Sequence, residues 1–137
     1  MPKDMTPVNP PTLAKPAGYS HGWEVRGGKT LYLAGQVAFD KDGKVVGRGD
    51  LVAQFRQVCE NLRALVAAAG GQLTDVVKLT IYVLDADEYK RHVKAIGGVY
   101  RDYFGKHFPA MTLVEVKGLY DEDQGCAIEI EGIAILD

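Results

Sequence analysis

The chain has 137 residues, of which 47% are apolar and 25% are charged, and its formal net charge is −2 at pH 7. This length is typical of a single domain, and the apolar fraction is sufficient for a buried core. The slight acidic excess argues against a nucleic-acid partner, because phosphate binding usually requires a basic surface. The two cysteines are too few for a disulfide scaffold.

The sequence predicts a cytoplasmic protein. It contains no apolar run long enough to cross a membrane. Its first residues lack the charged and then apolar layout of a signal peptide. Five of the six prolines lie in residues 1–17. Proline blocks helix formation, so we expect an extended N-terminal arm or mobile tail, followed by one domain over residues 18–137.

In the first half of the chain we expect a hairpin and a helix. Residues 23–26 and 30–38 are predicted to pair, since the glycines at 27 and 28 can adopt positive φ. Gly35 within the second strand indicates a bulge or the close approach of another group. Asp50 is a good N-cap for a helix over residues 51–69, where apolar residues recur every 3.6 residues.

The second half is predicted to be strand, helix and two late strands. Residues 76–84 form the strongest strand, and a capping-box-like segment at residues 85–88 then begins the second helix. The pair Gly97-Gly98 weakens that helix by about 1 kcal/mol per glycine relative to alanine. Pro109 marks the start of a strand to residue 116, and the last strand covers residues 126–136.

The predicted order is therefore β-β-α-β-α-β-β. Each helix has one apolar stripe, which favours an α+β fold with one mixed sheet and both helices on one face. We expect the uncovered face to carry Leu79 or Tyr82, with Met111 and Leu113. A monomer should not expose that much apolar surface, so we infer a closed homo-oligomer with clefts between its subunits. Any site is expected beside the two late strands.

Short motifs follow one another over residues 16–135. They are Gly18-Tyr19-Ser20, residues 31–36, Gln54-Phe55, Asn61-Leu62, Gly70, residues 75–78, Pro109-Ala110, residues 114–116, and residues 128–131 with Ala134. In this order and spacing, the sequence resembles the YjgF-type reactive intermediate deaminase (Rid) family. The resemblance implies a chorismate-mutase-like fold and a homotrimer with clefts at its interfaces. It also implies hydrolysis of enamines and imines released by pyridoxal-phosphate enzymes, which yields 2-keto acids and ammonia.

One position departs from the deaminating branch of that family. There, proline-alanine is followed by an arginine that pairs with the substrate carboxylate, and here the residue is Met111. A thioether offers no donors, so carboxylate binding should weaken about ten- to a hundred-fold. Leu113 and Ala34 replace a cysteine and a serine that are common in the family, which predicts a more apolar cleft. Candidates for a compensating charge are Arg101, Lys78 and His107.

The resemblance assigns Glu129 to positioning the attacking water. A glutamate among apolar neighbours can have a raised pKa suited to proton transfer, whereas the alternative is a solvated strand residue, as for Glu131. Tyr19 corresponds to the family's cleft tyrosine, or it anchors the arm. Gln36 donates to a ligand oxygen, or it satisfies backbone groups at a bulge. The predicted catalytic residues are Glu129 and Tyr19, and the predicted substrate-binding residues are Ala34, Gln36, Ala110, Met111 and Leu113.

The sequence predicts neither a metal nor a cofactor. The three histidines share no metal-like spacing, and no phosphate loop or dinucleotide fingerprint occurs. Three functions stay open: an interfacial hydrolase acting on an imine, enamine or related carbonyl compound; a metabolite-binding protein without turnover; and a ribonuclease or translation inhibitor, which the acidic balance opposes. For the first, we expect Tyr19, Gln36 and Glu129 to converge at one cleft.

Overall fold

The computed structural model describes residues 2–137. Its strands are β1 (Asp4–Val8), β2 (Gly22–Arg26), β3 (Lys29–Gln36), β4 (Val76–Val83), β5 (Ala110–Glu115) and β6 (Ile128–Leu136). Its α-helices are α1 (Leu51–Ala68), α2 (Ala86–Arg91) and α3 (Val93–Phe104), and the short 3₁₀ turns are η1 (Leu73–Asp75) and η2 (Glu122–Gln124). These bounds lie close to those predicted for the strands after residue 29 and for the first helix.

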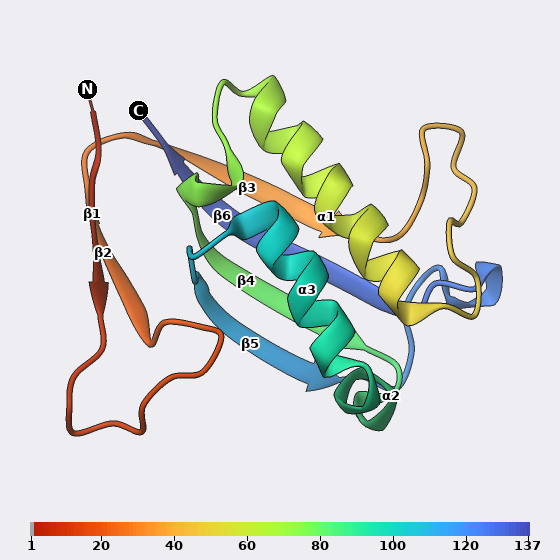
Figure 1. The fold of residues 1–137 in the computed structure, drawn as a ribbon. Coiled ribbons are helices and arrows are strands. Elements are labelled where there is room, and N and C mark those ends of the chain that lie inside the picture. Colours follow the sequence, from red (N-terminus) through yellow and green to blue (C-terminus); the bar gives the residue numbers. More distant parts are fainter. Residues whose placement is uncertain (1) are drawn as a thin grey trace.

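Four of the strands form one sheet in the order β3-β6-β4-β5, with the helices on one of its faces (Figure 1). β4 and β5 run parallel, and the other neighbours are antiparallel, so the sheet is mixed. The predicted α+β class is confirmed. β1 and β2 form a separate two-stranded ribbon beside this layered body.

The first helix begins as predicted, and the second is interrupted. The Asp50 carboxylate accepts a hydrogen bond from the Ala53 amide at 3.0 Å, which caps α1. Asp85 caps α2 in the same way, through the Glu88 amide at 3.1 Å. At His92 the backbone leaves the helical region (φ −106°, ψ 11°), so the predicted second helix is two helices, α2 and α3.

The core lies between α1, α3 and the inner face of the sheet. Helix residues such as Phe55, Leu62 and Ile96 are no more than 2% exposed, and so is Ile130 of the central strand β6. Burying each such side chain contributes about 1.5–3 kcal/mol. The helices are therefore held to the sheet by their apolar stripes, as their periodicity predicts.

The N-terminal segment is partly a strand, which the sequence did not predict. β1 pairs antiparallel with β2, and β3 pairs with β6, so the predicted hairpin between residues 23–26 and 30–38 is wrong. Gly27 and Gly28 adopt positive φ (72° and 78°) and turn the chain from one sheet into the other. The Lys3 ammonium lies 2.5 Å from the Asp75 carboxylate, and this ion pair ties the ribbon to the body.

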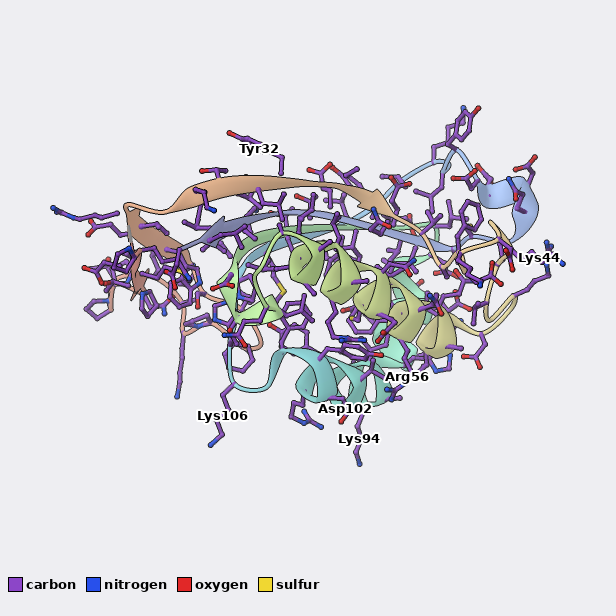
Figure 2. All side chains as sticks on the ribbon, turned by 90° about the horizontal axis from the view of Figure 1, so that it is seen from above. Tyr32, Lys44, Arg56, Lys94, Asp102 and Lys106 are labelled. Carbon is purple, nitrogen blue, oxygen red and sulfur yellow. The ribbon has the colours of Figure 1, made fainter. Side chains whose placement is uncertain are left out.

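The sheet face opposite the helices is open. Tyr32 rises from this outer face and is 77% exposed (Figure 2). Tyr82, Val114 and Ile133 lie on the same side. We expected this face to hold either Leu79 or Tyr82, together with Met111 and Leu113, and of these it holds only Tyr82. The structure places Leu79, Met111 and Leu113 on the helix side, because Met111 and Leu113 lie beside the buried Leu79 and Ile81 in the parallel β4–β5 pair.

Candidate functional site

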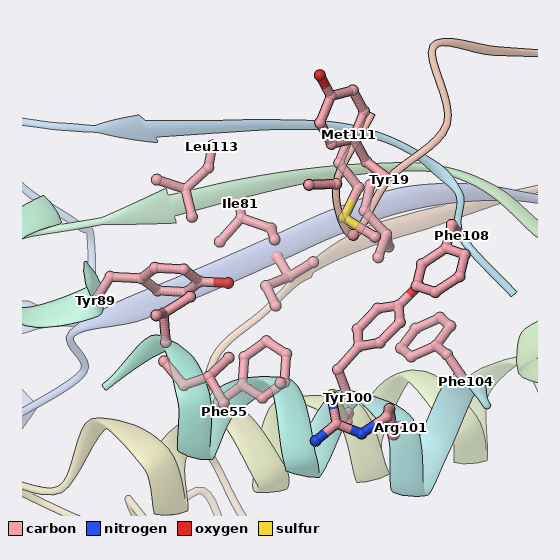
Figure 3. Close-up of a pocket in the computed structure, with 18 of the residues that line it drawn as sticks. Tyr19, Phe55, Ile81, Tyr89, Tyr100, Arg101, Phe104, Phe108, Met111 and Leu113 are labelled. Carbon is pink, nitrogen blue, oxygen red and sulfur yellow. The ribbon is translucent and has the colours of Figure 1, made fainter. Parts of the chain in front are cut away.

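The segment that follows the proline-rich stretch runs alongside the start of β5. The Ser20 amide donates a hydrogen bond to the Pro109 carbonyl at 3.1 Å, and Ser20 forms a parallel bridge with Ala110. Pro109 has no N–H to donate, so it fits the position just before the strand. These contacts place Tyr19 next to Met111, and in Figure 3 the Tyr19 hydroxyl lies on the side away from the helices.

A cavity of about 450 Å³ lies between α3 and β5, on the helix side of the sheet. Figure 3 shows the Met111 side chain directed into it from β5, and the Tyr89 hydroxyl pointing in from α2. Its volume is within the range of small-molecule sites, about 300–1,000 Å³. The lining is mostly apolar and aromatic, and it includes Tyr19, Phe55, Cys59, Ile81, Tyr89, Val93, Gly97, Tyr100, Arg101, Phe104, Phe108, Met111 and Leu113.

Three buried groups of the cavity wall, Cys59, Tyr89 and Tyr100, are held in their neutral forms. Burial raises the pKa of the Cys59 thiol to about 12, and burial likewise raises the pKa of Tyr89 to about 12. The Tyr100 hydroxyl donates to the His107 carbonyl at 2.5 Å, and burial raises its pKa as well. A buried neutral thiol is a poor nucleophile, so the cavity wall is suited to binding rather than to covalent chemistry.

Of the three candidates for a compensating charge, only Arg101 lines the cavity. The Lys78 ammonium donates to the Thr112 hydroxyl at 3.1 Å, and both residues belong to the outer face of the sheet. The His107 ring is 2.5 Å from the Val76 carbonyl and packs against Trp23. The structure therefore leaves Arg101 as the cation that a ligand in this cavity would meet.

Glu129 lies on the outer face of β6, opposite the helices. Its carboxylate packs against Gly35 of β3, where an added Cβ would stand 2.9 Å from the Glu129 Cδ atom. The pKa of Glu129 is raised above its ordinary value, first by burial and then by the nearby carboxylates of Asp121 and Glu131. The sequence predicted a bulge or the close approach of another group at Gly35. The group that approaches Gly35 is the Glu129 carboxylate, whose pKa is raised.

Gln36 and Gln54 use their side-chain amides to hydrogen-bond backbone groups of the protein. The Gln36 amide donates to the Ala34 carbonyl at 3.3 Å, at the bulge of β3, which favours its backbone role over ligand binding. The buried Gln54 amide group donates to the Gly125 carbonyl at 2.9 Å and accepts from the Ala127 amide at 2.9 Å. Gln54 thereby fixes the turn that leads into β6 and so positions Glu129.

The predicted site residues fall into two groups within one protomer. Tyr19, Met111 and Leu113 line the cavity on the helix side, whereas Ala110, just before Met111 in β5, is in register with Lys78 on the outer face. Glu129 lies on the outer face, beside the β3 segment that holds Ala34 and Gln36. A single chain therefore does not bring Tyr19, Gln36 and Glu129 to one cleft.

Sequence reasoning did not identify the aromatic wall of the cavity. Tyr89, Tyr100 and Phe104 fall on the apolar stripe predicted for the second helix, and such a stripe predicts an ordinary core. An apolar stripe at helical spacing has the same sequence signature whether it packs fully or borders a cavity. The tyrosine hydroxyls could have distinguished a cavity wall from a filled core. A buried tyrosine hydroxyl needs a hydrogen-bond partner, which a fully apolar core does not offer.

Within residues 2–137, no group of three or more histidine, cysteine, aspartate or glutamate side chains is arranged to hold a metal ion. In the same residues, no helix is both long and apolar enough to cross a membrane.

Known proteins resemble this chain along nearly its whole length. The profile of the family described as Endoribonuclease L-PSP matches residues 11–136. A RutC family protein of Pyrococcus horikoshii is 41% identical over 122 residues, which are 88% of this chain and 89% of that protein. The human 2-iminobutanoate/2-iminopropanoate deaminase is 30% identical over 107 residues, 78% of this chain and 73% of the human protein.

Solved structures agree with this. The crystal structure of YyfB from Yersinia pestis, a member of the conserved Rid protein family, superposes with a TM-score of 0.85 at 35% identity. The superposition covers 96% of this chain and 98% of the YyfB chain. With the family profile matching most of the sequence, the chain belongs to the YjgF/Rid family, the family described as Endoribonuclease L-PSP.

Proposed function

We propose that this chain forms a homotrimer whose interfacial clefts bind a small molecule and hydrolyse an imine or enamine, with Glu129 transferring the proton. The observation that carries the proposal is the Glu129 carboxylate, packed on Gly35 with its pKa raised. The name of the human relative, a 2-iminobutanoate/2-iminopropanoate deaminase, supports the reaction class.

The open sheet face supports the oligomer. Tyr32 is 77% exposed on this face, and Val114 is 39% exposed. Exposed apolar and aromatic side chains on one face are typical of a surface that a partner covers. A closed ring of copies would bring the outer face of one subunit, with its Glu129, against the β5 edge of the next, with its Met111 and Tyr19. Glu129 of one subunit and the Tyr19 and Met111 side chains of the next would then face one cleft.

The chemistry assigned to Glu129 is general acid–base catalysis. Its carboxylate takes a proton from water as the water oxygen bonds to the carbon of the C=N group. The proton passes to the nitrogen and gives an amino alcohol. The carboxylate then takes the proton of the new hydroxyl group and delivers it to the nitrogen as the C–N bond breaks, so ammonia leaves as the carbonyl forms. One water is consumed and one ammonia is released. A carboxyl group with a raised pKa is suited to both steps near neutral pH.

Met111 sets the expected substrate range. It places a thioether where a guanidinium would bind a carboxylate, and it faces an aromatic cavity. Small 2-imino acids have little apolar surface to bury there. We therefore expect 2-aminoacrylate and its imine to be poor substrates, by about ten- to a hundred-fold in kcat/KM relative to arginine-bearing relatives.

Metabolite binding without turnover is the second candidate. The Cys59 thiol of the cavity wall is held neutral, and within one chain Glu129 lies on the other face of the sheet, which favours binding if no cleft forms. A ribonuclease role, in line with the family's description, is opposed by the carboxylates of Asp121 and Glu131 near Glu129. Two further negative charges there would repel RNA phosphates.

An imine-hydrolysis assay tests the proposal. Imino acids are generated in place by an amino-acid oxidase from alanine, leucine and phenylalanine, and semicarbazide traps what is not hydrolysed. We expect the wild type to lower the trapped amount, and Glu129→Gln to lose about a hundred-fold or more of the rate. Glu24→Gln, an exposed change on the ribbon, is the control. Activity that survives in Glu129→Gln would exclude the assigned role, and ligand binding without any turnover would establish the second candidate.

A further inference from the structure

The helix α3 carries an arginine at the mouth of the cavity, next to two glycines. Gly97 and Arg101 both line the cavity, one helical turn apart. A helical side chain points back toward the preceding turn, so the Arg101 guanidinium lies over the glycine pair. The structure shows this arrangement directly. A Cβ added at Gly97 would meet the Arg101 Nη1 atom at 3.5 Å, and one added at Gly98 would meet Nη2 at 3.9 Å.

The glycine pair does not serve close packing of the helix on the sheet. Apart from its two chain neighbours and its own helix backbone, neither glycine has another atom within 4 Å of the added Cβ. Gly97 therefore leaves space in the cavity wall, beneath the guanidinium. Two glycines within a helix are unfavourable for helix formation, so their presence here is not explained by the stability of α3.

Arg101 also differs from the two arginines of α1, both of which pair with a carboxylate. The guanidinium of Arg56 pairs with Asp102 at 3.1 Å, and Arg63 pairs with Glu60. Among the described residues, no acidic side chain forms an ion pair with Arg101. A planar guanidinium with free donors, beside an aromatic cavity, matches the carboxylate of an amphipathic ligand.

We propose that this cavity binds a monocarboxylate with an aromatic or branched apolar body, with Arg101 holding the carboxylate at the mouth and Gly97 leaving room for the body. Tyr89 offers its hydroxyl inside the cavity to a polar group of the ligand (Figure 3). All the residues of this binding site belong to one chain, so the site does not depend on the proposed oligomer. Its interpretation as the side-chain pocket of an imino-acid substrate rests on the proposed function.

Three related probes test the site by calorimetric titration of the full chain. They are 3-phenylpropanoate, its uncharged amide 3-phenylpropanamide, and propanoate, which lacks the apolar body. We expect the phenyl acid to bind about ten-fold or more tightly than either of the others, because only it satisfies both Arg101 and the cavity. Equal binding of acid and amide, or no binding of any probe, would overturn the proposal.

Two matched pairs of variants locate the effect. Arg101→Met should weaken binding of the phenyl acid about ten- to a hundred-fold and leave binding of the amide unchanged. Arg101→Lys should keep part of the preference for the acid over the amide. Arg91→Met, the control, should keep all of this preference. Gly97→Leu should abolish binding of both phenyl probes, since its side chain would project into the cavity, while Gly98→Leu should not. Both leucine variants should melt higher than the wild type, which shows that they fold. An acid preference that persists in Arg101→Met would contradict the assignment.

The outcome is separable from that of the imine assay. Probe binding that depends on Arg101, in a protein without turnover, would leave this site standing and remove the enzymatic proposal. Turnover of imino acids that is insensitive to Arg101→Met and Gly97→Leu would support the enzymatic proposal and remove this site as the substrate's side-chain pocket.

Discussion

The carboxylate of Glu129 lies against the backbone of Gly35 in the neighbouring strand β3. A side chain at position 35 would overlap the carboxylate, so the glycine provides the space in which Glu129 lies against the sheet. This contact lowers the exposure of the carboxylate to water, and burial is the largest cause of its raised pKa. The bulge of β3 and the glycine within it are thus parts of the candidate site.

Gly35→Ala should displace Glu129. The new Cβ would stand 2.9 Å from the Glu129 Cδ atom, so the carboxylate must swing outward into water. We expect its pKa to fall toward the ordinary value, and imine hydrolysis to fall about a hundred-fold. Carboxyl ¹³C NMR titration measures the pKa of Glu129, and the semicarbazide assay measures the rate of imine hydrolysis. Gly22→Ala is the control, because its Cβ would have no neighbour nearer than 3.8 Å. An unchanged pKa in Gly35→Ala would mean that the carboxylate is not confined by β3.

The raised pKa of Glu129 makes stability depend on pH. The native state keeps the proton of Glu129 to higher pH than the unfolded chain, whose glutamate titrates near 4.5. The native state therefore loses stability as pH rises from about 4.5 through the raised pKa. We expect Glu129→Gln to be more stable than the wild type at pH 7, and the difference to vanish below pH 4.5. Urea unfolding at pH 4 and pH 7 measures this. A wild type that is the more stable of the two at pH 7 would contradict it.

Met111→Arg should change the substrate range. The side chain at this position points into the cavity beside Tyr19, so a guanidinium there would offer a second carboxylate anchor. We expect kcat/KM for the imine of alanine to rise about ten- to a hundred-fold and binding of 3-phenylpropanamide to weaken. Met111→Leu, which keeps an apolar side chain of similar volume, should change neither. Equal rates in all three proteins would show that residue 111 does not meet the substrate.

Gln54→Leu should destabilise the fold. The Gln54 side chain is 1% exposed and hydrogen-bonds the Gly47 and Gly125 carbonyls and the Ala127 amide. Leucine would fit the space but leave these buried groups without partners, at a cost of about 3 kcal/mol. Urea denaturation gives the value. The exposed change Gln124→Leu should alter stability by about 0.5 kcal/mol or less. A loss in Gln54→Leu no larger than in this control would contradict the assigned role.

Tyr32→Lys should weaken the oligomer. Tyr32 stands on the open sheet face, where a charge would be buried without a partner if another copy covered it. We expect sedimentation to give the wild type a mass about three times the 14.9 kDa of the chain, and Tyr32→Lys a lower one. Ala64→Lys, on the exposed side of α1, should leave the mass unchanged. A wild type that sediments as a single chain would remove the interfacial cleft from the proposal.

Local signals predicted most of the elements. The Asp50 cap, the stripe of α1 and the alternation of β4 are properties of near neighbours in the chain, and the structure has them where the sequence placed them. Pairing was less predictable. The strand at residues 22–26 pairs with β1 rather than β3 because the turn at Gly27 directs it out of the main sheet, a choice that depends on β6 far along the chain.

The sequence by itself determined the family, the helix caps, the strand that carries Glu129, and the bulge or close approach expected at Gly35. Only the tertiary structure decided which face each strand turns to the helices, and hence that Met111 looks into a cavity with Arg101 while Glu129 lies on the other side. Alternation along a strand divides residues into two sets but does not say which set is buried. That is decided by packing against α1 and α3, which are brought to the sheet from distant parts of the chain.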